Sequence, residues 1–194
     1  AAQLGGGLDE APREIALPGF VSAFDVSPDG TRALVQTAPT PLVDDSYTKM
    51  RVNLIDLASG DVTAIVETPG KIGDVEWAGD GSQLSLIAGV DMNDPAATTL
   101  HLVDASTGTY RALNAGAAEA AVDAEWLESG RLAAVIHVGT EARLRLYDAD
   151  GSVAQEYDPG ELILTRIEAA GGTLAVAADT PRHPSELFVW KDGA

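Results

Sequence analysis

The chain has 194 residues, of which 45% are hydrophobic, and 30 acidic against 12 basic residues give it a net charge of -18. This length and composition are typical of one globular domain and exclude an intrinsically disordered chain, while the negative charge repels nucleic acid and anionic membrane surfaces. The absence of cysteine excludes disulfides, thiolate nucleophiles and cysteine metal sites, and no apolar stretch approaches the roughly 20 residues of a membrane-spanning helix, so no membrane insertion is expected.

The first 19 residues are predicted to form an N-terminal arm that ends in a closing strand. The sequence opens with AAQLGGG and no initiator Met, which slightly favours an exported or periplasmic protein. Residues 14–19 resemble residues 64–70, which follow the pattern of the fourth strand of a repeat. We therefore expect residues 13–17 to pair with residues 187–190 near the other end of the chain and to close a ring of sheets.

A β-hairpin pattern recurs along the chain. Each copy combines a short strand, a turn that ends in Gly, and a second strand in which apolar residues alternate. The copies are residues 24–35, 75–86 and 124–135, with a weaker fourth copy at residues 167–176. Their turn glycines are spaced 51, 49 and 42 residues apart. This spacing is close to the roughly 40 to 50 residues of one propeller blade.

A second hairpin follows each first one, and the fourth unit stops after its third strand. Two hairpins make one blade, and the period-two alternation excludes a helical repeat. The sequence therefore predicts an all-β fold, a β-propeller built of four four-stranded antiparallel blades, which is either a complete small ring or part of a larger one. The predicted blades are residues 20–67, 70–114, 120–158 and 161–193. Terminal blades left open would favour self-association.

Several short motifs resemble the propeller repeats of serine peptidases of the prolyl oligopeptidase family. They are the Ser-Pro-Asp-Gly turn at residues 27–30, Trp77 and Trp126 at the end of an inner strand, and the Asp-x-x-x-Gly turns at residues 56–60 and 104–108. The periplasmic Tol-system propeller has the same repeats. The stretches at residues 40–47, 69–71 and 180–190 look like those of bacterial dipeptidyl or acylaminoacyl peptidases, which favours the peptidase family.

This resemblance implies a non-catalytic propeller that gates and orients peptide substrates for an α/β-hydrolase domain, which carries the catalytic triad in that family. The 194 residues contain no Gly-x-Ser-x-Gly nucleophile elbow, so no catalytic residue is assigned and the chain alone is expected to lack peptidase activity. The expected partners are a peptide substrate or a hydrolase domain. One alternative is a stand-alone propeller that acts as a protein-interaction module. Another is an enzyme that uses Glu76 and Glu125 directly as paired carboxylates.

Acidic residues recur at one inner-strand position in all four units. They are Asp25, Glu76, Glu125 and Glu168. Because alternate residues of a strand share a face, Asp74 and Asp123 join this set in two units, whereas Arg166 takes their place in the fourth. A ring of carboxylates around a channel would attract cations or the free amine of a peptide, and crowding would raise the pKa of some of them. The competing interpretation is that these side chains lie at a solvated channel mouth or bond to neighbouring backbone amides.

Two long connections, residues 37–50 and 89–98, join the second and third strands of the first two units. Propeller topology places both on one face, where binding loops of a rigid scaffold usually lie. The candidate binding residues on them are Asp44, Asp45, Tyr47, Asp91 and Asp94. The oxygen atoms of residues 91–95 suit calcium, but the spacing of a calcium hand is absent, which favours a simple Asx turn.

No metal site and no cofactor are predicted. His101 and His137 lie inside apolar strands and His183 lies in a Pro-rich connection, and no pair of histidines has the spacing of zinc ligands. The large aromatic side chains Trp77 and Trp126 are expected to be buried between adjacent blades.

Overall fold

The structure is a computed structural model that describes residues 12–93, 96–114 and 118–191. Within these residues, fifteen β-strands form four antiparallel sheets, and the chain has one short helix. The predicted all-β propeller fold is confirmed. Each sheet is a meander in which every strand pairs with the next one along the chain, as expected for two successive hairpins. No helix among the described residues has the length and apolar character to cross a membrane.

The sheets follow the predicted units in chain order. The first sheet comprises β1 (Phe20–Val26), β2 (Arg32–Ala38), β3 (Arg51–Asp56) and β4 (Val62–Val66), with the helix α1 (Val43–Thr48) between β2 and β3. The second comprises β5 (Ile72–Trp77), β6 (Gln83–Ala88), β7 (Thr99–Asp104) and β8 (Tyr110–Ala112), and the third β9 (Glu119–Trp126), β10 (Leu132–Val138), β11 (Glu141–Tyr147) and β12 (Val153–Tyr157). The fourth has three strands among the described residues, β13 (Ile163–Ala170), β14 (Thr173–Thr180) and β15 (His183–Lys191).

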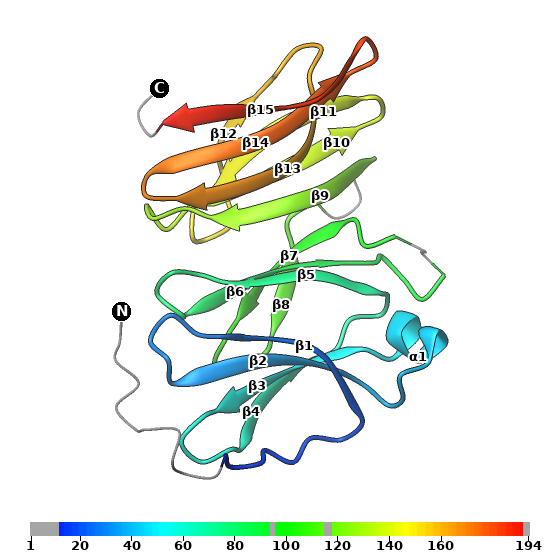
Figure 1. Cartoon of the computed structure of the whole chain (residues 1–194), viewed down its shortest axis with the longest axis vertical. Helices are drawn as coiled ribbons and strands as arrows, with labels where there is room; N and C mark the ends of the chain where they lie inside the picture. Colours follow the sequence, from blue (N-terminus) through cyan, green and yellow to red (C-terminus); the bar gives the residue numbers. More distant parts are fainter. Residues whose placement is uncertain (1–11, 94–95, 115–117, 192–194) are drawn as a thin grey trace.

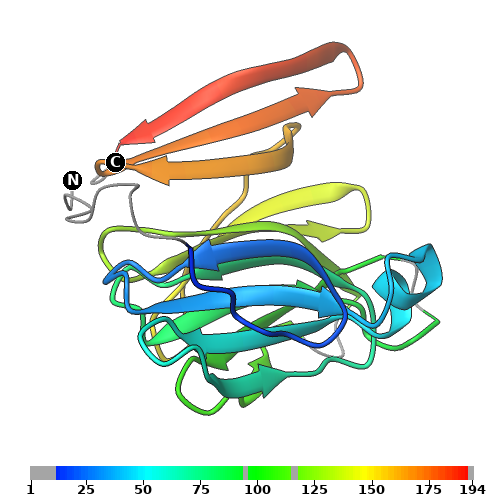
Figure 2. The same cartoon turned by 60° about the horizontal axis from the view of Figure 1, so that its bottom comes forward.

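The four sheets are arranged as an open arc. The first sheet lies at one end of the long axis and the fourth at the other (Figure 1). The turned view shows the strands of the fourth sheet, in orange and red, apart from the blue strands of the first sheet (Figure 2). The first strands of the second, third and fourth sheets are close to one another, since β9 contacts both β5 and β13. No strand pairing among the described residues joins the first sheet to the fourth.

The hydrophobic core consists of layers between successive sheets. Between the first and second sheets, Leu34 and Leu84 are buried together with Trp77. A second cluster that contains Ile136 lies between the second and third sheets, and a third that contains Leu164 lies between the third and fourth. Full burial of each such side chain stabilises the fold by about 1.5 to 3 kcal/mol, so these layers hold the sheets together.

The recurring glycines build the turn after the first strand of a sheet. The amides of Gly30, Gly81 and Gly130 each donate to the carbonyl oxygen three residues earlier, at 2.8 to 2.9 Å. Their φ angles lie between 71° and 81°, a region that disfavours any side chain. In the second sheet the Asp80 carboxylate accepts from the Ser82 amide at 2.8 Å, which lowers the pKa of Asp80. The recurring Gly is therefore a requirement of the turn, and the Asp before it in the first two sheets, Asp29 and Asp80, accepts hydrogen bonds within the turn.

The N-terminal arm does not close the ring. Residues 12–17 form no strand, and the Arg13 guanidinium donates to three successive carbonyl oxygens of the β3–β4 turn at 2.5 to 3.1 Å. Ile15 and Leu17 pack on an apolar cluster of β2 and β3, on the face of the first sheet that no other sheet covers. The prediction that residues 13–17 pair with residues 187–190 is therefore wrong. Burial of Ile15 and Leu17 against this free apolar face keeps the arm on the first sheet.

Candidate functional site

The inner-strand carboxylates come from the first strand of each sheet. Each lies shortly before the turn that leads to the second strand, on β1, β5, β9 and β13 respectively: Asp25, Glu76, Glu125 and Glu168. Because β9 lies between β5 and β13, the acids of these three strands are neighbours. The structure brings Glu76 and Glu125 into contact, whereas Asp25 and Glu168 lie outside this pair.

Glu76 and Glu125 form a carboxyl pair across the junction of the second and third sheets. Their side chains hydrogen-bond to each other, and both are half-buried. Burial, followed by the like charges of Glu125 and Asp74, raises the pKa of Glu76 to about 9. Burial also raises the pKa of Glu125, to about 7, and the charge of Glu168 adds to this effect. The two groups titrate together, so between about pH 7 and 9 the predominant form of the pair holds one shared proton.

Asp123 and Asp74 extend the acidic surface along the same two strands. The Asp123 carboxylate accepts from the Ile167 amide of β13 at 2.7 Å and from its neighbour Ala124 at 3.2 Å. The first of these bonds joins the third sheet to the fourth. Burial raises the pKa of Asp123, although the bond from Ile167 opposes that shift. Asp74 is exposed and bonds to the amide of Val75 at 3.1 Å.

The acids of the outer two sheets are not part of the pair. Asp25 is exposed and accepts from the amide of Val26 at 2.8 Å, which matches the expectation of carboxylates that bond to backbone amides. Glu168 is also exposed and forms an ion pair with Arg166 at 3.0 Å. The acidic cluster is therefore an arc over the second, third and fourth sheets, centred on Glu76 and Glu125, and the four acids do not form a symmetric ring.

The loop between β2 and β3 folds into α1 and lies against the start of the second sheet. Asp45 is buried, accepts from Thr40 Oγ1 at 2.6 Å, and forms an ion pair with Lys49 at 2.7 Å, and these two partners lower its pKa. Asp44 is exposed in the first turn of the helix. The exposed Tyr47 ring lies 4.6 Å from the Lys71 ammonium, which attaches the helix to the second sheet.

The loop between β6 and β7 lies at the same side of the molecule as α1 (Figure 1). Asp91 is exposed, and its carboxylate accepts from the Asn93 amide at 2.7 Å, which is the Asx turn expected for this stretch. Asp94 lies outside the described residues. Within the described part of the chain, no group of three or more His, Cys, Asp or Glu side chains is arranged to hold a metal ion.

The histidines are structural. His137 Nε2 donates to the Leu164 carbonyl at 2.7 Å, which links the third sheet to the start of the fourth. His101 is buried with its ring edge-on to Tyr110 at 5.2 Å, and burial lowers its pKa, so this side chain is neutral at pH 7. His183 begins β15, and its Nδ1 is 3.2 Å from Thr180 Oγ1 at the end of β14.

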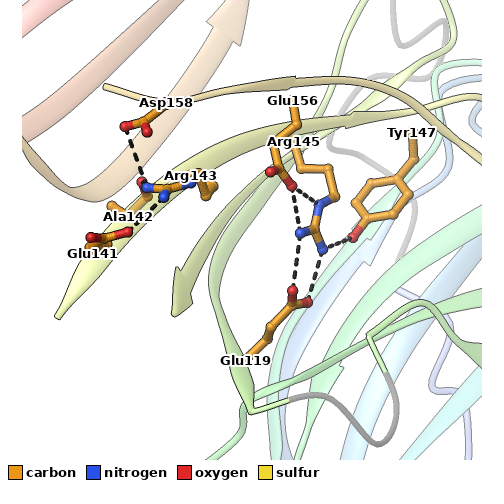
Figure 3. A network of polar contacts seen from close by, with 8 residues as sticks. All are labelled: Glu119, Glu141, Ala142, Arg143, Arg145, Tyr147, Glu156 and Asp158. Atoms are coloured by element: carbon orange, nitrogen blue, oxygen red, sulfur yellow. Dashed lines mark hydrogen bonds and ion pairs between the residues drawn. The ribbon is translucent and has the colours of Figure 1, made fainter. Parts of the chain in front are cut away.

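The sequence pattern missed a polar network that joins three strands of the third sheet (Figure 3). Arg145 on β11 donates to both oxygens of Glu119 on β9, at 2.9 and 3.1 Å, and to Glu156 on β12 at 2.7 Å. It also donates to the hydroxyl of the buried Tyr147 at 3.3 Å. Glu119 raises the pKa of Arg145, and Arg145 lowers that of Glu119. Because every charge in this network is paired, the network stabilises the sheet and leaves no unpaired charged group that could bind or react with a ligand.

No protein-family model matches this chain, and none of the curated proteins matches it. Among solved structures, the chain is similar to a puromycin-hydrolysing peptidase of Mycobacterium tuberculosis, with a TM-score of 0.66 and 20% identity over 94% of this chain and 29% of that one. A second puromycin hydrolase gives a TM-score of 0.63 and 22% identity over 89% of this chain and 27% of that one. The β-propeller domain of Cps50 from Myceliophteria thermophila gives 0.56 and 16%, over 88% and 53%.

The chain thus spans less than a third of the length of the two peptidases and about half of the Cps50 chain. It is a β-propeller domain that resembles the propeller of peptidases of the prolyl oligopeptidase family. At these identities the likeness establishes the fold, and the function has to be argued from the residues of this chain.

Proposed function

We propose that this chain is a non-catalytic propeller domain that gates and orients peptide substrates for a hydrolase domain of the prolyl oligopeptidase type. The observation that carries the proposal is the Glu76–Glu125 pair on neighbouring inner strands. After Glu125, the charges that act most strongly on Glu76 are those of Asp74 and Asp123, which are also negative. A peptide with a free N-terminal ammonium would supply the missing positive charge.

The chemistry of binding follows from the shared proton of the pair. A neighbouring ammonium favours the ionised form of both carboxyls, so the pair loses its proton when the peptide binds. The propeller would in this way select peptides by their free amine and fix the position of their first residue. The hydrolase domain would then act on a bond at a fixed distance from that residue.

The test is calorimetric titration of the chain with a short proline-containing peptide that has a free amine, and with its N-acetylated form. We expect only the free amine to bind at pH 7, with proton release seen as a dependence of the heat on the buffer. The double variant Glu76→Gln and Glu125→Gln should lose binding. The control double variant Glu14→Gln and Glu161→Gln removes two exposed charges from other places and should retain it.

Equal binding of the acetylated peptide, or unchanged binding by the Glu76→Gln and Glu125→Gln variant, would contradict the proposal. A second candidate function is a stand-alone protein-interaction module. It is favoured by the exposed apolar side chains of the end sheets, such as Phe24 on β1 and Leu187 on β15. That function predicts no response to either short peptide.

A further inference from the structure

The junction of the first and second sheets contains an internal guanidinium site. The Arg32 guanidinium lies 5.1 Å from the centre of the Trp77 ring. It also donates to the carbonyl oxygens of Gly81 and of Ala105, the latter at 3.3 Å. A cation stacked on an aromatic ring with two carbonyl acceptors is a complete recognition site for a guanidinium group. In this junction the chain fills the site with its own arginine.

The next junction has the same acceptors. Trp126 ends β9 as Trp77 ends β5, and Gly130 donates to the first residue of its turn as Gly81 does. Ala149 follows the aspartate that begins the β11–β12 turn, just as Ala105 follows the aspartate that begins the β7–β8 turn. By their positions in the turns, the ring and both carbonyl-bearing residues of the first site therefore recur between the second and third sheets, although both turns of the third sheet are one residue shorter.

The arginine does not recur. Ser27 donates its amide to the Arg32 carbonyl, and in the second sheet Ala78 donates in the same way to Gln83. Gln83 thus occupies the position of Arg32, with a shorter and uncharged side chain. Among the described residues, no Lys or Arg is stacked on the Trp126 ring, whereas Arg32 is stacked on Trp77.

The space left by this substitution is an open groove of about 860 Å³ between the second and third sheets. It is lined by Gln83, Trp126, Gly130 and Ala149, that is, by all four equivalents of the first site. A methyl group built on Gly130 would meet no atom within 4 Å, whereas one built on Gly81 would lie 3.2 Å from the Arg32 guanidinium. Trp126 is only half-buried, whereas Trp77 is 7% exposed.

The charges around the groove favour a cation. Three carboxylates line it, from Asp80, Glu128 and Asp148, and the one basic side chain among its lining residues, Arg131, is paired with Asp148 at 2.8 Å. Arg111 of β8 reaches the β11–β12 turn itself, next to Gly151, and lines a separate hollow with Ala149, but it does not line this groove. The surplus of negative charge, within a chain of net charge -18, draws cationic groups toward the groove.

We propose that this groove binds a guanidinium group carried on an arginine side chain of a ligand, stacked on Trp126 and hydrogen-bonded to the carbonyl oxygens of Gly130 and Ala149. The ligand would take the place that Arg32 occupies in the preceding junction. Neither Glu76 nor Glu125 lines this groove, and the proposal does not rest on the function proposed above. Its specificity would come from the planar, multiple donors of a guanidinium, which an ammonium group lacks.

The experiment is a titration of the isotopically labelled chain by nuclear magnetic resonance, which resolves the Trp126 indole and the Gly130 amide. The probes are N-acetylarginine amide, its neutral isostere N-acetylcitrulline amide, and N-acetyllysine amide. We expect saturable shifts of these two signals with the arginine compound, and affinities weaker by at least about tenfold for citrulline and about threefold for lysine. A pentapeptide with a central arginine then distinguishes a peptide ligand, which should bind more tightly than the single amino acid.

Two variants test the assignment. Gln83→Arg would fill the groove from within, as Arg32 fills the first site, and should abolish binding while keeping the fold. Gln155→Arg adds the same charge on the exposed face of β12 and should leave the affinity unchanged within about twofold. If Gln83→Arg does not fold, Glu128→Gln, an exposed change at the rim of the groove, should still weaken binding.

Three results would overturn the proposal. One is an equal response to citrulline and arginine, because charge would then play no part. Another is a set of shifts centred on Trp77 or the N-terminal arm with none at Trp126. The third is unchanged binding in the folded Gln83→Arg variant.

Discussion

At the scale of single residues, Trp77 and Trp126 illustrate how one repeat position can have two environments. Both were predicted to be buried between blades, and this is confirmed for Trp77, which is 7% exposed. Trp126 is half-buried because Gln83 does not reach over it as Arg32 reaches over Trp77. Alignment of the repeats within the chain identified the Trp position, but the difference in burial between Trp77 and Trp126 depends on one side chain from the preceding sheet.

Replacement of Trp77 by Ala should reduce the free energy of unfolding by about 3 to 5 kcal/mol, because it leaves a cavity in the core between the first and second sheets. The same change at Trp126 should cost about 1 to 3 kcal/mol, since part of that ring is already in contact with solvent. Urea unfolding of both variants provides the measurement. A larger loss at Trp126 than at Trp77 would contradict this reading of the two junctions.

The carboxyl pair leads to a prediction about pH. Glu76 and Glu125 have pKa values near 9 and 7 in the folded chain, above the ordinary value of 4.5. A carboxyl with a higher pKa in the folded state binds its proton more tightly there, so the folded state loses stability as pH rises from about 4.5 to 9. Glu76→Gln should remove most of this loss. Its free energy of unfolding at pH 9 should exceed that of the parent by at least about 1 kcal/mol, which is less than the free energy that corresponds to a shift of one pKa unit.

Unfolding by urea at pH 5, 7 and 9 tests this prediction, with Glu161→Gln as a control that removes an exposed charge elsewhere. The control should keep the pH dependence of the parent. Identical pH profiles for Glu76→Gln and the parent would mean that the pair is not protonated in the folded chain.

At the scale of elements, the strands were predictable because each hairpin carries its own signal. Alternating apolar residues and a Gly with positive φ are local features, and the four sheets follow the predicted units. The N-terminal arm was not predictable in this way. Its sequence resembles a strand, but its position depends on competition between β15 and the uncovered face of the first sheet, where Ile15 and Leu17 are packed.

The Arg145 network could not be predicted from a local sequence pattern, because its bonded partners are up to 26 residues apart and come from three strands. Arg145→Met should keep the packing of the aliphatic stem but leave Glu119 and Glu156 without their cation. We expect a loss of about 2 to 4 kcal/mol in the free energy of unfolding, because Arg145 and Glu119 are both largely buried.

The matched control for Arg145→Met is Arg51→Met, which breaks the Arg51–Glu67 ion pair of 3.1 Å between two side chains that are both more than half exposed. That change should cost less than about 1 kcal/mol. Chemical denaturation of both variants measures the difference. Equal losses would mean that the network adds nothing to the ordinary strength of a surface ion pair.

At the scale of the whole molecule, the arc is open and its two ends differ. The free face of the first sheet is covered in part by the N-terminal arm, although β1 still exposes Phe24, which is 71% accessible. The fourth sheet exposes Leu187 and Val189 on β15, at 72% and 57%, and has no fourth strand among the described residues. An apolar face beside an unpaired strand edge is a site where another sheet can add.

The isolated chain should therefore self-associate through its end sheets at micromolar concentrations, with a mass of two or more chains in sedimentation velocity. The double variant Phe24→Ser and Leu187→Ser should shift the chain to a monomer, because it removes the most exposed apolar side chain from each end strand. Val153→Ser, a comparable change on the exposed edge strand β12, should leave the association of the parent intact.

The mass also distinguishes two modes of association. A closed symmetric dimer would give one defined mass, because each open end then pairs with an end of the other copy. Association at one end type alone would give a mass that grows with concentration. A parent chain that stays monomeric at every concentration would contradict the argument, because the open ends would then not drive association.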